Sequence, residues 1–96
     1  DYCICMKSLA RHKQFRKDFS KVRLTDQHLQ KFILYVGALL NGKKLPVESK
    51  DHSLSGEWDD FREFHLGGDQ LVIYQENIEF VTLARMGSHA QLFRSM

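Results

Sequence analysis

The chain has 96 residues, 43% of them hydrophobic and 27% charged, which are the proportions of an ordinary globular protein with one modest core. Its longest apolar run, residues 32–40, is shorter than the roughly 20 residues that cross a bilayer, and the N-terminus has no signal-peptide pattern. These features predict a single domain over residues 1–96 in the cytoplasm, with no membrane partner.

The first segment holds both cysteines, Cys3 and Cys5. Their spacing is too short for an ordinary structural bridge, and the two-residue gap of redox and zinc motifs is missing. We expect both thiols to be inert, as in a reducing compartment. Met6 is a candidate for the natural start, with residues 1–5 an upstream extension or an addition from an expression vector. A short strand is predicted within residues 3–9.

The charge is distributed unevenly between the two halves of the chain. Residues 1–50 contain 11 Lys and Arg against 4 Asp and Glu, for a net charge of +7, whereas residues 51–96 contain 3 against 8, for −5. A basic half suits a polyanion or an acidic protein partner, although solvated helix faces account for such a pattern equally well.

The basic half has the pattern of two helices. Phe15, Phe19 and Val22 recur at i, i+4 and i+7, which predicts an amphipathic helix over residues 12–23. Its opposite face is basic and carries Lys13, Arg16, Lys17 and Lys21. A second helix is predicted over residues 26–40, with Thr25 as its N-cap and Asn41-Gly42 as its stop. Its predicted buried stripe comprises Leu29, Phe32, Ile33, Val36 and Leu40.

After Pro46 the hydrophobic pattern changes to the two-residue alternation that is typical of strands. Residues 58–66 alternate, so that Arg62 and His65 point to opposite faces, and Glu63 shares the face of His65. Apolar runs at residues 71–74 and 78–84 predict two more strands, joined by a hairpin turn at Glu76-Asn77. The predicted fold is α+β, ordered β-α-α-β-β-β, with both helices on one face of a small, mainly antiparallel sheet. We expect the other face to be free to form a concave site.

Three of the five histidines stand at the ends of predicted elements in polar surroundings, namely His52, His65 and His89. An imidazole has an unperturbed pKa of about 6.5, so it donates and accepts protons near neutral pH. Together with Asp69, these histidines predict a site that deprotonates a nucleophile and protonates a leaving group. A histidine taken singly is more often a solvated or capping residue, and this is our interpretation of His12 and His28.

Five separate segments, in this order and spacing, resemble the signature of YafQ-type toxins in the RelE/ParE superfamily. They are residues 50–58 (KDHSLSGEW), residues 61–65 (FREFH), Asp69, residues 71–74 (LVIY) and residues 85–93 (RMGSHAQLF). The resemblance extends over about residues 7–94. It departs from the family pattern at Gly68-Asp69-Gln70, because the family usually has a proline before the aspartate and a large apolar residue after it.

The resemblance implies a RelE-like fold and a toxin of a type II toxin–antitoxin system. Such toxins cleave mRNA in the A site of the translating ribosome, where the ribose 2′-hydroxyl attacks the adjacent phosphate. This chemistry needs a base, an acid and positive charge near the phosphate, and the family uses no metal or other cofactor. The implied partners are mRNA on the 30S subunit and a cognate antitoxin, which we expect to contact the basic helical half and the region near the site.

The resemblance also implies roles for individual residues. The matching catalytic set is His52, His65, Asp69 and His89. Phe93 matches an aromatic residue that contacts the RNA by stacking on a base. Arg85 and Lys50 are further candidates for substrate binding. Arg62 is expected to be structural, because alternation puts it on the face opposite His65.

Three alternatives stay open from the sequence. Three histidines and an aspartate are suitable zinc ligands, but the histidine spacings of 13 and 24 residues match no compact zinc motif. A gyrase-inhibiting toxin of the ParE branch would share the fold without this histidine set. A catalytically inactive module that binds only an antitoxin would share both the fold and the residues.

Overall fold

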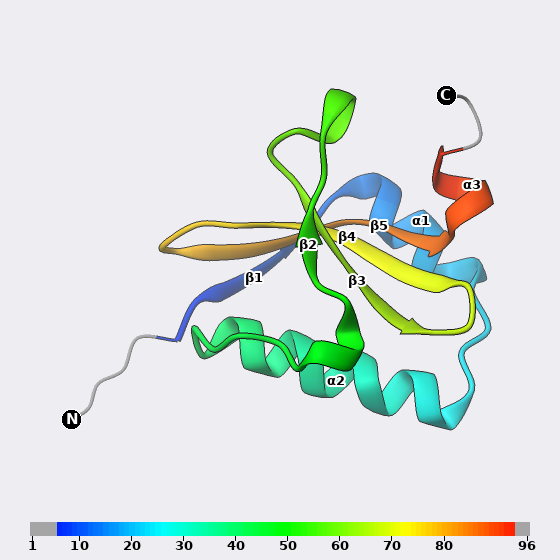
Figure 1. Ribbon diagram of the computed structural model, residues 1–96, viewed down its shortest axis with the longest axis horizontal. Helices are drawn as coiled ribbons and strands as arrows, with labels where there is room; N and C mark the ends of the chain where they lie inside the picture. Colours follow the sequence, from blue (N-terminus) through cyan, green and yellow to red (C-terminus); the bar gives the residue numbers. More distant parts are fainter. Residues whose placement is uncertain (1–5, 94–96) are drawn as a thin grey trace.

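The computed structural model describes residues 6–93, which form three α-helices and one five-stranded sheet (Figure 1). In chain order the elements are β1 (Ser8–Arg11), α1 (Lys13–Lys21), α2 (Asp26–Leu40), β2 (His52–Ser53), β3 (Arg62–Gly67), β4 (Gln70–Glu76), β5 (Phe80–Ser88) and α3 (His89–Phe93). Two 3-10 turns, η1 (Val47–Ser49) and η2 (Gly56–Trp58), flank β2. The predicted α+β class is confirmed, whereas β2 and α3 were not predicted. Cys3 and Cys5 lie outside the described residues.

The strands lie in the order β1-β5-β4-β3-β2, and only β1 and β5 are parallel. The prediction of a strand from residue 58 is wrong, because η2 occupies residues 56–58 and β3 begins at Arg62. The predicted turn at Glu76-Asn77 is also displaced, since Glu76 ends β4. Asn77 Oδ1 accepts the backbone N–H groups of Glu79 and Phe80, each at 2.8 Å, and this fixes the turn before β5.

The two N-terminal helices have local signals that the structure uses. Helix α2 spans Asp26–Leu40 as predicted, and the Thr25 hydroxyl caps it by accepting the His28 N–H at 3.1 Å. After Asn41 the chain leaves the helix at Gly42, whose φ of +72° favours glycine. Helix α1 is shorter than predicted, because His12 is its N-cap and Val22 its C-cap.

The predicted buried stripe of α2 is partly wrong. Leu29 and Ile33 are 40% and 61% exposed, whereas Tyr35 and Leu39 are buried together with Val36. The Tyr35 ring packs edge-on against Phe64 of β3, with ring centroids 5.5 Å apart. Residues 32–40 are apolar on almost every side of the helix, so periodicity does not select one stripe, and contact with the sheet decides it.

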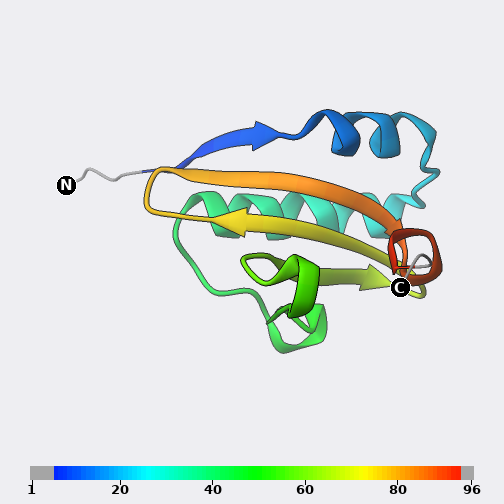
Figure 2. The same cartoon turned by 90° about the horizontal axis from the view of Figure 1, so that it is seen from above.

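Side chains cover both faces of the sheet. Helices α1 and α2 form the main core on the first face, with Phe15, Val36, Leu66, Val72 and Leu83 among its buried residues. Figure 2 shows α2 running along this face. On the second face, a smaller cluster contains the buried residues Leu71, Ile73, Ala84 and Leu92, with Trp58, Phe61 and Phe93 packed against it. The prediction that this face would be free is therefore wrong in part, since residues 54–61 and α3 cover some of it.

Candidate active site

The strand register places two rows of residues on the second face. One row runs across four strands, because His52 pairs with Glu63, Glu63 with Ile73, and Ile73 with Arg85. The neighbouring row contains His65, Leu71 and Gly87. Side chains two residues apart on one strand share a face, so Glu63 and His65 point the same way, as predicted.

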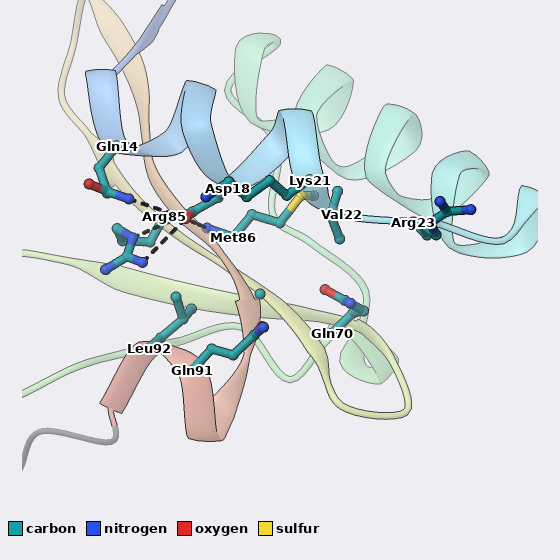
Figure 3. Close-up of a pocket in the computed structure, with 11 residues that line it drawn as sticks. Gln14, Asp18, Lys21, Val22, Arg23, Gln70, Arg85, Met86, Gln91 and Leu92 are labelled. Atoms are coloured by element: carbon teal, nitrogen blue, oxygen red, sulfur yellow. Dashed lines mark hydrogen bonds and ion pairs between the residues drawn. The ribbon is translucent and has the colours of Figure 1, made fainter.

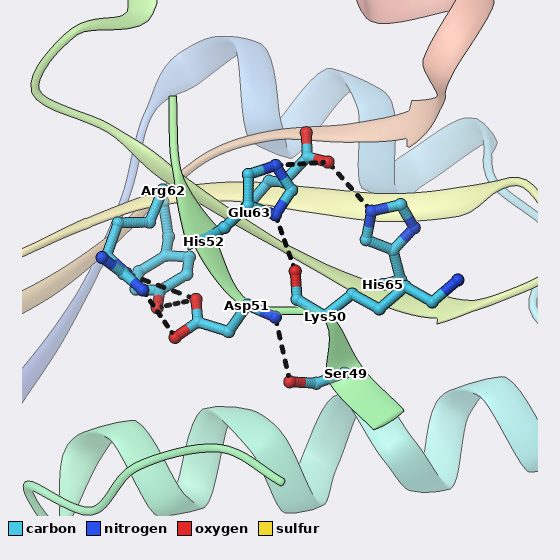
Figure 4. A network of polar contacts seen from close by, with 8 residues as sticks. Ser49, Lys50, Asp51, His52, Arg62, Glu63 and His65 are labelled. Carbon is cyan, nitrogen blue, oxygen red and sulfur yellow. Dashed lines mark hydrogen bonds and ion pairs between the residues drawn. The ribbon is translucent and has the colours of Figure 1, made fainter. Parts of the chain in front are cut away.

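Glu63 lies between two of the predicted catalytic histidines (Figure 4). Its Oε2 is 2.9 Å from His65 Nε2 and 3.4 Å from His52 Nε2. The Glu63 side chain is only 5% exposed, whereas those of His65 and His52 are 26% and 51% exposed. The ring centroids of His52 and His65 lie 6.3 Å apart, and the ring planes are 28° from parallel. A buried carboxylate thus holds two accessible imidazoles side by side, and we call these three residues the His–Glu–His cluster.

The backbone before β2 fixes the tautomer of His52. Its Nδ1 lies 2.7 Å from the carbonyl oxygen of Lys50, which only accepts, so Nδ1 carries a hydrogen. Lys50 ends η1 in the left-handed conformation, with a φ of +52°. With Nδ1 directed at Lys50, the Nε2 atom of His52 faces the Glu63 carboxylate at 3.4 Å. The contribution of Lys50 visible here is therefore its backbone, while its side chain is exposed.

On the first face, the residues next to this cluster form a separate polar group. Asp51 accepts hydrogen bonds from the buried Tyr74 hydroxyl at 2.6 Å and from Arg62 Nη2 at 3.1 Å. Burial and then the neighbouring Asp51 raise the pKa of the Tyr74 phenol. The hydrogen bond to Asp51 likewise raises the pKa of Arg62. We call Asp51, Arg62 and Tyr74 the Asp51 clamp, and it confirms that Arg62 lies opposite His65.

The third predicted histidine lies on α3. His89 is exposed, and its ring centroid is 4.7 Å from that of Phe93, one helical turn away. Phe93 is partly buried and also packs edge-on against Trp58 at 6.4 Å. Because α3 directly follows β5, His89 comes two residues after Gly87, which lies in the same row as His65. The topology thus brings α3 to the end of the sheet where His65 lies.

Asp69 occupies the tight turn between β3 and β4. Gly68 precedes it with a φ of +54°, a conformation that short hairpin turns favour for glycine. Within residues 6–93, the Asp69 side chain makes no hydrogen bond or ion pair, and it is exposed. The turn is at the same end of the sheet as α3, because Gln70 pairs with Ser88. Asp69 is therefore near this end without contacting the His–Glu–His cluster.

Arg85 is held by α1. Its Nε and Nη2 lie 2.7 and 3.2 Å from the Asp18 carboxylate, which also accepts the Met86 N–H at 3.0 Å. Burial acts to raise the pKa of Asp18, but the hydrogen bonds from Arg85 and Met86 outweigh it, and the pKa lies below its usual value. These contacts fasten α1 along the part of β5 that β1 does not cover.

The other two histidines keep structural positions. His12 is the N-cap residue of α1, with its ring 6.5 Å from that of Phe61. His28 lies against Gly67, where an added Cβ would come within 2.8 Å of the His28 Nε2 atom. His12 thus has the capping position expected of it, whereas His28 is partly buried against Gly67 and is not simply solvated.

The described residues contain no group of three or more His, Cys, Asp and Glu side chains arranged to hold a metal ion. In the His–Glu–His cluster, both Nε2 atoms face the same carboxylate oxygen, at hydrogen-bond distance for His65 and at 3.4 Å for His52. Nor is any helix within residues 6–93 long and apolar enough to span a membrane.

Glu63 is the functional candidate that sequence reasoning missed. The alternation in residues 58–66 already placed it on the face of His65, but nothing in that pattern paired it with His52. That pairing depends on β2, a strand of two residues that is too short to show a period.

The fold and the histidine site define a small α+β protein with acid–base groups on one face of its sheet. The family of YafQ, described as the bacterial toxin of a type II toxin–antitoxin system, matches residues 7–94. The chain therefore belongs to the YafQ family of bacterial toxins.

Three similar proteins illustrate the family. The Escherichia coli "mRNA interferase toxin YafQ" is 31% identical over 81 residues, covering 83% of this chain and 88% of the relative. A copper-bound mutant toxin from Helicobacter pylori has a TM-score of 0.79 and 35% identity, covering 92% of this chain and all of that one. The toxin in the E. coli DinJ-YafQ toxin-antitoxin complex has a TM-score of 0.77 and 28% identity, covering 92% and 98%.

Proposed function

We propose that this toxin is an mRNA interferase, an endoribonuclease that cuts mRNA on the translating ribosome and is neutralised by a cognate antitoxin. The observation that carries the proposal is the His–Glu–His cluster, in which a buried carboxylate supports two accessible imidazoles. Relatives named as mRNA interferases and solved as a toxin–antitoxin complex support the activity and the partner.

The proposed reaction is attack of a ribose 2′-hydroxyl on the adjacent phosphorus. The 2′-oxygen–phosphorus bond forms, the bond from phosphorus to the 5′-oxygen breaks, and a cyclic phosphate and a 5′-hydroxyl result. A base accepts the proton of the 2′-hydroxyl, and an acid delivers one to the departing 5′-oxygen. His52, His65 and His89, with Asp69, are the catalytic residues in this proposal.

Glu63 is proposed as a positioning residue for the two cluster histidines. Its carboxylate accepts a hydrogen bond from His65 Nε2 and so fixes the orientation of that ring. A cationic histidine near the phosphate also offsets the negative charge that develops on the phosphate oxygens. Because the cluster is open to solvent through His52, an RNA strand has access to it.

The remaining site residues are proposed to bind RNA. Phe93 offers a ring face beside His89, and stacking of a base on an aromatic side chain contributes about 1–3 kcal/mol. Arg85 and Lys50 are proposed to contact the substrate, although Arg85 also binds Asp18. The acid–base groups suffice for the reaction, so we propose that it needs no metal ion.

The test is cleavage mapping on a defined mRNA in a purified translation system, with and without ribosomes. We expect discrete cuts that require translation, and a wild-type toxin pretreated with EDTA should cut equally well when ribosomal magnesium is kept constant. Loss of cleavage that zinc or copper alone restores would overturn metal independence. Equal cleavage of free mRNA would overturn ribosome dependence, and no cleavage at all would overturn the nuclease.

A further inference from the structure

A second polar groove lies beside the candidate active site, outside the His–Glu–His cluster. It has a volume of about 580 Å³ and lies between the C-terminal part of α1, the end of β5 and α3 (Figure 3). Its polar lining residues are Gln14, Asp18, Lys21, Arg23, Gln70, Arg85 and Gln91.

The groove carries an excess of positive charge. Asp18 is the only acidic residue in its lining, and Arg85 neutralises it at 2.7 Å. Lys21 and Arg23 are exposed and form no ion pair with any other residue between 6 and 93. Two cations without carboxylate partners suit an anionic ligand such as the phosphates of a nucleic acid.

Amide side chains in the same groove offer hydrogen bonds to a base. The Gln70 Oε1 atom is buried and has no hydrogen-bond partner among the described residues. Gln91 uses its Oε1 to accept the Ser88 N–H at 2.9 Å, which leaves its NH₂ group to donate. Glutamine recognises base edges because it donates and accepts in one plane.

Helix α3 connects the groove to the candidate active site. The rings of His89 and Phe93 pack against each other in a tilted arrangement one turn apart, while Gln91, two residues from each, lines the groove. An α-helix with its side chains is about 10–12 Å across, so one RNA strand that crosses α3 reaches both sides.

We propose that this groove binds the RNA strand next to the cut, with phosphate on Lys21 and Arg23 and a base edge on Gln70. The inference rests on the proposed nuclease function and deepens it by assigning a specificity subsite. RNA fits better than an acidic segment of the antitoxin, because an acidic peptide would leave the buried Gln70 oxygen facing further acceptors.

The proposed phosphate contacts are tested with the double variant Lys21→Gln/Arg23→Gln. The control is Lys43→Gln/Lys44→Gln, which removes the same charge from the loop after α2. On a translated mRNA at limiting toxin, the groove variant should cleave about tenfold more slowly than wild type, with a weaker dependence on salt, because fewer counterions are released. The control should cleave like wild type. Equal rates for both double variants, with matched melting temperatures, would overturn the proposal.

The proposed recognition of a base edge by Gln70 is tested with Gln70→Leu. This variant should keep most of the total cleavage but redistribute it among sites that differ in the base beside the cut. An unchanged distribution across a library of translated codons would overturn the role of Gln70. Affinity for the cognate antitoxin is measured in parallel, and groove variants that lose only antitoxin binding would reassign the groove to that partner and overturn RNA binding.

A binding assay separates this inference from the nuclease proposal. Fluorescence anisotropy with a short single-stranded RNA at low salt should show weaker binding by the groove variant than by the Lys43/Lys44 control. If wild type cleaves no mRNA, the nuclease proposal fails, while this assay still shows whether the groove binds RNA. Equal RNA affinity of the two variants would overturn the proposed RNA binding by the groove.

Discussion

The His–Glu–His cluster and the Asp51 clamp are built from adjacent residues on opposite faces of the sheet. Asp51 precedes His52, and Arg62 precedes Glu63. Because side chains alternate along a strand, Asp51 and Arg62 point to the first face, while His52 and Glu63 point to the second. In the clamp, the buried Tyr74 hydroxyl and the Arg62 guanidinium both donate to Asp51. In the cluster, Glu63 keeps one oxygen that has no hydrogen-bond partner among residues 6–93, and its histidines are accessible.

This difference separates stability from chemistry within a few residues. The clamp satisfies its polar groups inside the protein, so changes there should cost stability. The cluster leaves its two imidazole side chains partly exposed, so changes there should cost activity and leave stability nearly intact. The clamp also anchors the residue before His52, which means that it positions one member of the cluster.

The largest effect is expected from the cluster. His65→Ala should lower cleavage of translated mRNA by about 10²–10⁴-fold, because general acid–base catalysis typically contributes that much. His89→Ala should be similarly impaired, whereas His12→Ala should stay active. Primer extension on a translated mRNA measures the cut, and thermal melting checks the fold. Full cleavage by a folded His65→Ala/His89→Ala variant would contradict the catalytic assignment.

The clamp should respond in the opposite way to the loss of its carboxylate. Asp51→Ala should lower the free energy of unfolding by about 2–3 kcal/mol, because it leaves the buried Tyr74 hydroxyl and the partly exposed Arg62 without their acceptor. Urea unfolding measures this change. The matched control is Asp60→Ala at an exposed position, which should change stability by less than about 0.5 kcal/mol. Equal stability of the two variants would show that the clamp is not structural.

A smaller effect is expected from the phenol alone. Tyr74→Phe should cost about 1–2 kcal/mol at neutral pH, the range for one buried hydrogen bond. Burial and Asp51 raise the pKa of Tyr74 above its ordinary value of 10.0, so the neutral phenol stabilises the fold fully below that value. This contribution is lost as the pH rises above about 10.

The pH series distinguishes the phenol from general alkaline unfolding. Melting temperatures from about pH 8 to about pH 11 should fall more steeply for wild type than for Tyr74→Phe, because the variant lacks the titrating group. Tyr35 remains in both proteins and serves as an internal control. Parallel curves would mean that the Tyr74 phenol is not coupled to folding.

The smallest effect on stability is expected at the basic face of α1, which lies outside both groups. Its four cations, Lys13, Arg16, Lys17 and Lys21, are exposed, and changing all of them to Gln should alter stability by less than about 0.5 kcal/mol. Binding to ribosomes or to the antitoxin should weaken nonetheless, and more at low salt than at high salt. Unchanged affinity for both partners across that range would mean that this face only keeps the protein in solution.

Sequence by itself determined the features that depend on neighbouring residues. The bounds of α2 follow from Thr25 and Asn41-Gly42, because capping is a local hydrogen-bonding preference. The division of Arg62 and His65 between two faces follows from the two-residue period of a strand. Local pattern thus predicted α1, α2 and the face that carries His65, whereas it did not predict α3, and His65 lies within β3 and not at its end.

Only the tertiary structure decided which distant groups meet. Glu63 joins His52 to His65 through a strand of two residues, and Arg85 meets Asp18 across 67 positions of sequence. The buried stripe of α2 was likewise set by contact between Tyr35 and Phe64, because apolar residues on nearly every side of the helix leave its orientation open. Such contacts depend on how whole elements pack, and a side-chain period along one element carries no information about its partner.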